Sequence, residues 1–572
     1  MTAFGKIFIN LQSKKSEQYN FATASMKTFN TAGTCRPNEH YMVDIADRLE
    51  IIRKMVAKGN YFCINRGRQY GKTTTLEAIS STLSDEYCIF SISFESVEDA
   101  CFKDENHLYA KFISLLARSF MWTPLAGLDP AVAEMIVEFS KDHKTECSSD
   151  DLELLISSIC HQNSKPIILV IDEVDQAGNH PSFLKFLGLL RGMFLSRERI
   201  PAFQSIILAG VYDIKNLKLK IRTEEEHQYN SPWNVCANES RATSSLDCYA
   251  ECRQTSPYGS IAVPFDVDMS LSAKGIADML GEYKADHNLT FDEAFVGQMI
   301  RDYTAGYPFL VSRICQIIDA EQYTWDKEGV LKAVNALLKE SNTLFDDMQK
   351  KLTQFPGLSD MMKSIIFGGK RVSFNYYDRD INIAVMFNFV KEELGATKIA
   401  CRIFETWLYN YYISLDKPSH IYQLGEYEKN QFVHDGFIDM RLLMERFCVH
   451  FNEIYRPGHD DQFVEDNGRK IFLTYLRPII NGIGNYYCEA QTRDLTRTDI
   501  IIDYLGQQYI VELKIWRGQS YNERGEKQLA EYLERYNLQT GYMVSFCFNK
   551  TKQTGLLTPV ELNGRTLIEA IV

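Results

Sequence analysis

The stretch YFCINRGRQYGKTTTL, from Tyr61 to Leu76, holds an apolar run, a polar turn and then the tripeptide Gly71-Lys72-Thr73. This order predicts a strand, a phosphate-binding loop and a helix. Backbone N–H groups at the start of a helix attract anions, and Gly71 allows close approach to a phosphate because it has no Cβ. Lys72 can reach the β- and γ-phosphates of a nucleotide, and Thr73 can hold Mg²⁺ through its hydroxyl.

The loop departs from the full phosphate-binding pattern at one position. The pattern asks for glycine at position 66, where this chain has Arg66, and a glycine follows one place later at Gly67. We expect Arg66, Gly67 and Thr74 to join the nucleotide contacts. The alternative is a chance Gly-Lys-Thr in front of a helix.

A second stretch, KPIILVIDEVDQ from Lys165 to Gln176, raises the expectation of an ATP site. Its unbroken apolar run ends in Asp172 and Glu173, which is typical of a central parallel strand whose tip reaches a ligand. Asp172 is a candidate Mg²⁺ ligand, and Glu173 can polarise the attacking water. Because these acids follow the loop by about 100 residues, a chance coincidence is less plausible.

Two further residues are candidates for nucleotide contacts. QSIILAGVYD, from Gln204 to Asp213, predicts another buried strand, and Asp213 could read the γ-phosphate through a water, although strand-end polarity explains it equally well. Helical periodicity returns between residues 270 and 322, where Pro308 suits the first turn of a helix. Arg313 in that helix could face the nucleotide or be a surface arginine.

The charge composition restricts how the protein could bind nucleic acid. The 572 residues carry 62 Lys and Arg against 75 Asp and Glu, a net charge of −13, so any nucleic-acid contact must come from a local basic patch. No apolar run reaches the roughly 20 residues of a membrane helix, and the N-terminus lacks a signal-peptide pattern. We expect a cytoplasmic protein without membrane association whose 14 cysteines are reduced thiols.

The last 120 or so residues predict a second site. A helix from Glu465 to Ile480 precedes three strand-like runs, and another helix and strand follow. This αβββαβ order is typical of a nuclease core. Asp499 begins the second strand-like run. Glu512 and Lys514 lie two residues apart on the third run, so both side chains project from one face of the sheet.

These side chains suit metal-dependent phosphodiester cleavage. Asp499 and Glu512 would form an oxygen-rich site for Mg²⁺ or Mn²⁺, and Lys514 would orient water or stabilise developing charge. Either Glu489 or Glu465 could supply a third carboxylate, and Gln528 could join the site. Basic residues that could follow a phosphate backbone are Arg493, Arg497, Lys514, Arg517, Arg524 and Lys527. The alternative is an ordinary sheet with an exposed Glu and Lys pair.

Both halves resemble known families. The segments GRQYGKTT, IDEVDQ, LAGVYD and TAGYPFLVSRIC resemble the AAA-like P-loop ATPases of the STAND and archaeal-ATPase branch over roughly residues 20 to 340. This resemblance implies a nucleotide-driven switch. The segments RTDI, VELKIW and EKQLAEYL resemble the PD-(D/E)XK nuclease superfamily, with Thr498 in place of the usual proline. That resemblance implies a nuclease domain of the kind fused to such ATPases.

The predicted fold is α/β with four parts. Residues 1–262 form an ATPase core with a parallel sheet, and residues 263–340 form a helical lid. Residues 341–450 form a helical or winged-helix-like connector. Residues 451–572 form an αβββαβ domain that resembles restriction endonucleases.

The functional hypothesis is an ATPase whose nucleotide state gates metal-dependent cleavage of nucleic acid. We expect DNA rather than RNA as the substrate. The resemblance implies phage defence or a mobile-element system as the setting. One alternative is a signalling or scaffold ATPase whose C-terminal domain binds nucleic acid or protein without cutting, and another is a DNA-remodelling motor. We also expect a homo-oligomer, because a neighbouring chain often supplies an arginine to such sites. The sequence does not show which of three candidates would be that arginine: Arg191, Arg197 or Arg199.

Overall fold

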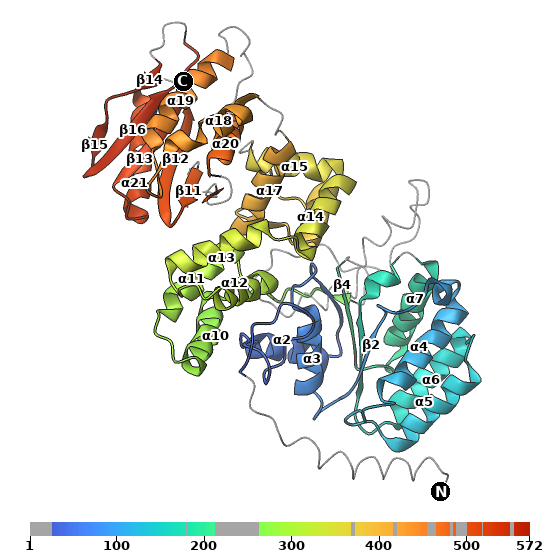
Figure 1. Ribbon diagram of the computed structural model, residues 1–572. Coiled ribbons are helices and arrows are strands. Elements are labelled where there is room, and N and C mark those ends of the chain that lie inside the picture. Colours follow the sequence, from blue (N-terminus) through green and yellow to red (C-terminus); the bar gives the residue numbers. More distant parts are fainter. Residues whose placement is uncertain are drawn as a thin grey trace.

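The computed structural model describes residues 26–178, 180–211, 262–367, 372–415, 420–454, 465–480, 484–487, 500–516, 519–549 and 554–572. Figure 1 shows a lobe built on a sheet, a group of lid and connector helices, and a C-terminal lobe at the far end from the first. The described residues include no helix that is both long enough and apolar enough to cross a membrane.

The first lobe contains a five-stranded parallel sheet with the strand order β2-β3-β4-β1-β5. Its strands are β1 (Tyr61–Asn65), β2 (Cys88–Ser93), β3 (Ile167–Asp172), β4 (Ser205–Gly210) and β5 (Ala262–Val263). The structure confirms the predicted strands before the loop, before the acid pair and at residues 205–210. Because β1, β3 and β4 run parallel, the loop after β1 and the acids at the end of β3 lie at the same edge of the sheet, on either side of β4.

Helices cover both faces of this sheet (Figure 1). Alternate strand residues point to opposite faces, so the apolar strands supply a core on each side. One face packs against α2 (Ala46–Ala57) and α3 (Lys72–Thr82). The other packs against α4 (Glu105–Ser119), α5 (Pro130–Asp142), α6 (Ser149–Gln162) and α7 (Pro181–Ser196). Two short 3-10 helices, η1 (Asp99–Phe102) and η2 (Val174–Gln176), complete this lobe.

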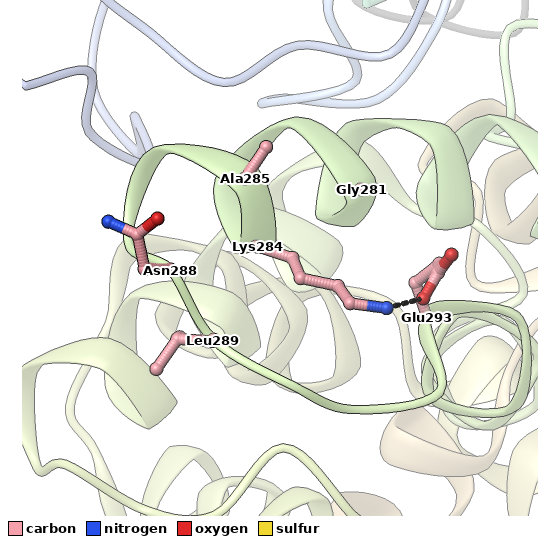
Figure 2. A pocket seen from close by; sticks show the side chains of 6 residues that line it. All are labelled: Gly281, Lys284, Ala285, Asn288, Leu289 and Glu293. Atoms are coloured by element: carbon pink, nitrogen blue, oxygen red, sulfur yellow. Dashed lines mark hydrogen bonds and ion pairs between the residues drawn. The ribbon is translucent and has the colours of Figure 1, made fainter.

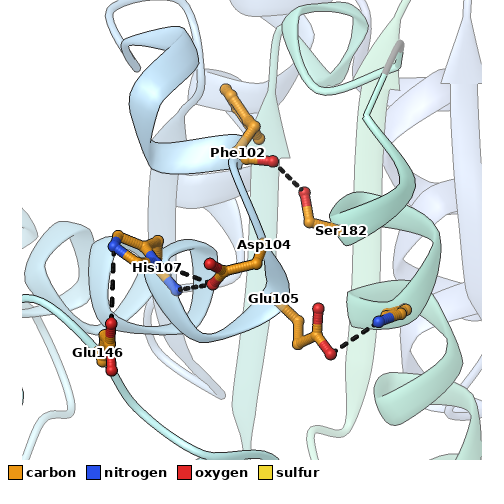
Figure 3. A network of polar contacts seen from close by, with 7 residues as sticks. Phe102, Asp104, Glu105, His107, Glu146 and Ser182 are labelled. Carbon is orange, nitrogen blue, oxygen red and sulfur yellow. Dashed lines mark hydrogen bonds and ion pairs between the residues drawn. The ribbon is translucent and has the colours of Figure 1, made fainter.

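Polar contacts at the start of α4 fix the helical layer (Figure 3). Asp104 accepts a hydrogen bond from the His107 backbone N–H at 3.1 Å and so satisfies a free donor of the first turn. Glu105 pairs with Lys185 of α7 at 2.7 Å, and the Ser182 hydroxyl donates to the Phe102 carbonyl at 2.9 Å. These contacts hold α7, the helix that follows the acids of β3, against α4.

The lid and connector follow in sequence. The lid contains α10 (Ala273–Asp286), α11 (Glu293–Thr304), α12 (Pro308–Ala320) and α13 (Lys327–Lys339). The connector contains α14 (Thr343–Gln354), α15 (Pro356–Ile366), α16 (Arg379–Met386), the antiparallel strands β6 (Val390–Glu393) and β7 (Ala396–Ile399), and α17 (Arg402–Leu415). Pro308 opens α12 as the sequence predicts, because its missing N–H has no helical partner in a first turn.

Gly306, in the turn between α11 and α12, has a left-handed backbone with φ of 73°. A Cβ at this position would lie 2.2 Å from the Leu271 carbonyl oxygen. Gly306→Ala is therefore expected to lower the free energy of unfolding by about 2–3 kcal/mol, from conformational strain and overpacking together. Thermal and denaturant unfolding would measure the change.

Gly188→Ala in α7 is the matched control for Gly306→Ala. A Cβ at Gly188 meets nothing within 4 Å, and alanine is a better helix former than glycine. We expect this variant to be as stable as the wild type or slightly more so. Equal stability of the two glycine variants would contradict the strained-turn interpretation.

The C-terminal lobe contains a mixed sheet with the order β10-β11-β12-β13-β16-β14, and β15 pairs with β16. The strands β10, β11 and β12 are antiparallel neighbours, whereas β12, β13 and β16 run parallel. Its elements include α20 (Glu465–Ile480), β10 (Gly484–Tyr487), β11 (Ile500–Tyr504), β12 (Gln507–Ile515), α21 (Gln519–Arg535) and β13 (Thr540–Phe546). The last strands are β14 (Gly555–Leu556), β15 (Val560–Leu562) and β16 (Arg565–Ile571). The described elements follow the expected αβββαβ order.

Two helices before residue 455 pack with this lobe rather than with the connector (Figure 1). These are α18 (His420–Phe432) and α19 (Met440–Ile454), with the short strands β8 (Val433–His434) and β9 (Phe437–Ile438) between them. The Glu428 carboxylate of α18 accepts from the Tyr475 hydroxyl of α20 at 2.7 Å and lies 2.8 Å from the His450 ring. The expected boundary after residue 450 thus falls inside a packed unit.

Candidate functional site

The phosphate-binding loop has the geometry that the sequence predicts. Strand β1 ends at Asn65, and α3 begins at Lys72. Gly71 caps the helix with φ of 79°, a left-handed conformation that glycine adopts without strain. Gln69 also has a positive φ, 57°, which is uncommon for a residue with a side chain. The helix start therefore presents backbone N–H groups and partial positive charge at the edge of the sheet.

The Lys72 side chain is folded back onto its own loop. The residue is buried, and its Nζ donates to the Arg66 carbonyl at 3.0 Å and the Gly67 carbonyl at 3.1 Å. Burial lowers the pKa of Lys72, and the nearby acids Glu173, Asp175 and Asp172 oppose this shift. Neutral carbonyl oxygens are weaker partners for an ammonium group than an anionic phosphate, so Lys72 can exchange them for a bound nucleotide.

Thr73 and Asp172 lie together, as a shared Mg²⁺ site requires. The Thr73 hydroxyl donates to Asp172 Oδ2 at 3.0 Å, and the Glu173 backbone N–H donates to Asp172 Oδ1 at 2.9 Å. A hydroxyl and a carboxylate are hard oxygen ligands of the kind that Mg²⁺ prefers. The donor set therefore fits Mg²⁺ held next to the nucleotide phosphates.

Glu173 follows β3 in a left-handed conformation with φ of 53°. Burial, first of all, raises the pKa of its carboxyl group above the ordinary value, and Lys72 partly opposes the rise. A glutamate with a raised pKa is a better proton acceptor than an ordinary one, which suits activation of water. The neighbouring Asp175, to which the sequence assigned no role, accepts from the Val211 N–H at 2.6 Å and so fixes the end of β4 against these acids.

Arg66 explains how the loop tolerates the missing first glycine. Its guanidinium donates to the Val267 carbonyl at 2.9 Å and to the Phe265 carbonyl at 3.5 Å, and it lies 5.6 Å from the Phe265 ring centroid. Arg66 is also absent from the described residues with positive φ. The side chain thus joins the loop to the segment after β5, and only the backbone of Arg66 faces Lys72.

The lid also contacts the phosphate loop. The Tyr307 hydroxyl donates to the Arg68 carbonyl at 2.5 Å, and the Tyr307 ring packs edge-on against Tyr70 at 4.7 Å. Thr74 accepts a hydrogen bond from the Cys35 backbone N–H at 3.2 Å. Residues from three separate parts of the sequence therefore surround the loop.

The candidate arginines lie in different places. Arg313 forms a two-pronged ion pair with Glu340, with nitrogen–oxygen distances of 3.0 and 2.5 Å, and its contact with a nucleotide stays a prediction. Arg197 donates to the Gly59 carbonyl at 2.6 Å. Gly59 precedes β1 whereas the loop follows it, so Arg197 lies at the opposite end of the sheet from its own phosphate loop.

A surface hollow on the lid contains none of the expected site residues. It lies between α10 and α11, where Lys284 pairs with Glu293 at 2.7 Å (Figure 2). Lys284 also donates to the Phe291 carbonyl at 2.7 Å. Its charge is thus already engaged within the lid.

In the C-terminal lobe, three of the expected residues come together. Glu512 and Lys514 project from β12, with Lys514 Nζ 3.3 Å from Glu512 Oε1. Lys514 also donates to Gln528 Oε1 of α21 at 3.3 Å. Glu512 is only 1% exposed, so its carboxylate lies in a low-dielectric setting beside the Lys514 ammonium group. A Cβ at Gly525 would lie 2.9 Å from Lys514 Nζ, which explains why α21 can approach β12 so closely.

The sequence patterns above did not predict two further buried polar residues on the same face of the sheet. Ser545 of β13 lies opposite Lys514 in the parallel register, and its hydroxyl donates to Glu569 of β16 at 2.6 Å. Both are buried. The sequence did contain a signal for them. Each of the apolar segments GYMVSFCF and TLIEAIV holds one polar residue, and a buried polar group requires a hydrogen-bond partner.

Several expected residues lie outside the described part of the chain: Asp213, Glu489 and Asp499, and Arg493, Arg497 and Arg517 of the expected basic set. The side chain of Glu465 does so too. Within the described residues, no three His, Cys, Asp or Glu side chains form a group that could hold a metal ion. The metal ligands of the C-terminal site therefore stay predictions.

One family model matches part of the chain. Residues 36–235 match the AAA-like domain family. The matched segment spans the phosphate loop, the acids at the end of β3 and strand β4, which supports ATP binding. No curated protein matches the sequence.

Several archaeal structures are similar to the chain. The Walker-type ATPase paby2304 of Pyrococcus abyssi has 15% identity and a TM-score of 0.40, over 66% of this chain and 99% of that one. The ORC2 protein of Aeropyrum pernix, in ADPNP–ADP complexes, has 12% identity and a TM-score of 0.34, over 68% and 98%. The ORC1 protein of the same organism, in complex with DNA, has 12% identity and a TM-score of 0.25, over 66% and 94%.

Proposed function

We propose that this protein binds and hydrolyses ATP in its AAA-like domain and that the nucleotide state gates a metal-dependent nuclease in the C-terminal lobe. DNA is the proposed substrate. The setting that the resemblance implies is phage defence or a mobile-element system. The observation that carries the nuclease part is the meeting of Glu512, Lys514 and Gln528 on one buried face.

At the ATP site, each side chain has a distinct task. Lys72 leaves the loop carbonyls to bind the β- and γ-phosphates, and Thr73 with Asp172 would hold Mg²⁺. When bound, the metal would supply charge stabilisation at the phosphates. Glu173 accepts a proton from the attacking water, a task that its raised pKa favours.

At the C-terminal site, Glu512 and Asp499 would hold Mg²⁺ or Mn²⁺, which would supply Lewis-acid stabilisation of the scissile phosphate. Lys514 contributes a fixed positive charge for the developing negative charge, because its contacts to Glu512 and Gln528 already orient its ammonium group. Gln528 is a positioning residue that acts through Lys514.

A short turn of the lid supports the gating part of the proposal. Tyr307 donates to the Arg68 carbonyl in the phosphate loop, and Tyr303, four residues earlier, donates to Asp503 of β11 at 3.3 Å. Strand β11 begins at Ile500, directly after Asp499. A displacement of the phosphate loop can therefore reach the strand that follows a proposed metal ligand through one rigid turn.

Cleavage assays on circular, linear and single-stranded DNA and on RNA test this function. Each is run with Mg²⁺ or Mn²⁺, with and without ATP. We expect metal-dependent DNA cleavage whose rate changes with ATP in the wild type, and loss of this ATP response in Lys72→Ala. Lys54→Ala is the matched control, because Lys54 is an exposed lysine of α2.

The outcomes separate the alternatives. No cleavage of any polymer, together with ATP binding, favours a scaffold or signalling ATPase. Fast ATP turnover that DNA stimulates, without ATP-dependent cleavage, favours a remodelling motor. An ATP response that survives in Lys72→Ala would contradict gating through this site.

A further inference from the structure

The connector makes a hydrogen bond to the backbone of the phosphate loop. The Gly67 backbone N–H donates to Asn388 Oδ1 at 2.7 Å, across 321 residues of sequence. A Cβ at position 67 would lie 2.9 Å from the Phe387 carbonyl oxygen. Glycine at position 67 therefore admits the connector to the loop, a role distinct from close approach to a phosphate.

The backbone around Asn388 is well fixed. Asn388 follows α16 with φ of 58°, a conformation that asparagine adopts more readily than most residues. Its N–H donates to the Val385 carbonyl at 2.9 Å, and the Phe389 N–H donates to the Ala384 carbonyl at 2.8 Å. These bonds end the helix and hold the amide side chain at a defined position beside the loop.

The chemistry of the contact sets the orientation of the Asn388 amide. An N–H donor requires an acceptor, so the oxygen of the amide faces Gly67 and its NH₂ group points elsewhere. Among the described residues, none accepts a hydrogen bond from this NH₂ group. Asn388 thus keeps two donor hydrogens available while its oxygen holds the loop.

The γ-phosphate end of the nucleotide belongs beside the same peptide. Lys72, which reaches the β- and γ-phosphates in loops of this kind, rests with its Nζ 3.1 Å from the Gly67 carbonyl. The anion-binding N–H groups at the start of α3 belong to other residues and are not used by Asn388. Asn388 therefore borders the phosphate position without occupying it.

We propose that the Asn388 amide donates a hydrogen bond to the γ-phosphate of ATP and so lets the connector distinguish ATP from ADP. The inference rests on the ATP-binding part of the proposed function and is independent of the nuclease part. ADP offers no γ-phosphate, so with ADP the amide keeps only its contact with Gly67. The connector is then a sensor of the third phosphate.

Calorimetric titration with ADPNP and with ADP, both with Mg²⁺, tests the inference on the full chain. Asn388→Asp keeps an oxygen acceptor for the Gly67 N–H but replaces the NH₂ donor with a negative charge. We expect Asn388→Asp to weaken ADPNP binding by roughly tenfold or more and ADP binding by less than about twofold, because hydrogen bonds to charged groups are strong. Asn388→Ala should weaken ADPNP binding in the same direction.

Asn375→Asp is the matched control, because Asn375 is an exposed asparagine of the connector. Unchanged selectivity in both Asn388 variants would overturn the inference, as would equal weakening of ADP and ADPNP binding, which indicates a role in loop shape alone. Tighter ADPNP binding in Asn388→Ala would also overturn it, because Asn388 would then compete with the phosphate. If the wild type binds neither nucleotide, the proposed ATP site is absent, and this inference fails together with the ATP-binding proposal.

Discussion

Glu173→Gln is expected to slow ATP hydrolysis by about 10²–10⁴-fold, the usual contribution of a general base, and to leave ATP affinity nearly unchanged. Glutamine has the shape of glutamate but accepts no proton at neutral pH. Burial raises the pKa of Glu173, so its carboxylate is a competent base near neutrality. Steady-state phosphate release and equilibrium ATP binding would measure the two effects separately.

The pH dependence of hydrolysis follows from the direction of the same shift. The carboxylate is the active form, so hydrolysis should fall as the pH drops through the pKa of Glu173. Because that pKa is raised, the fall should begin at a higher pH than for an ordinary glutamate, whose pKa is about 4.3. Glu77→Gln, an exposed glutamate of α3, is the control and should hydrolyse ATP normally. Full activity in Glu173→Gln would exclude it as the base.

Glu512→Gln is expected to reduce DNA cleavage by at least about 100-fold, since a metal ligand's charge supports several kcal/mol of transition-state stabilisation. ATP hydrolysis should be unaffected. Glutamine retains the size of the buried side chain, and Lys514 retains its bond to Gln528, so the sheet should keep its packing. Cleavage rates at saturating Mg²⁺ and thermal unfolding would be measured together.

Glu531→Gln is the matched control for Glu512→Gln, because Glu531 is an exposed residue on α21. It should cleave DNA as the wild type does. If Glu512→Gln also cleaves normally, the buried Glu512 and Lys514 pair is structural. The C-terminal lobe would then fit a binding module better than a nuclease.

Local patterns predicted much of the backbone arrangement at the candidate ATP site. The order of strand, turn and helix in residues 61–76 and the acids at the end of an apolar run are short-range signals, because hydrophobic period and glycine content determine them directly. The two-residue period of a strand also predicted that the Glu512 and Lys514 side chains lie on the same face. The contact with Gln528 was a weaker expectation, because it depends on how α21 lies over β12.

Long-range contacts were not predictable from the same patterns. No periodicity indicates that Arg66 points to the segment after β5 or that Glu340 holds Arg313, because an arginine side chain can reach many directions. The pairing of Ser545 with Glu569 needs the register of two parallel strands. The contact of Gly67 with Asn388 needs the relative placement of two domains.

The distance in sequence between Gly67 and Asn388 has a consequence for synthesis of the chain. Gly67 and Asn388 are 321 positions apart, so at about 5–20 residues per second synthesis from one to the other takes about 16–64 s. During that interval the nascent phosphate loop lacks its partner from the connector. With the proposed γ-phosphate contact, newly made chains would discriminate ATP from ADP only after Asn388 has been synthesised.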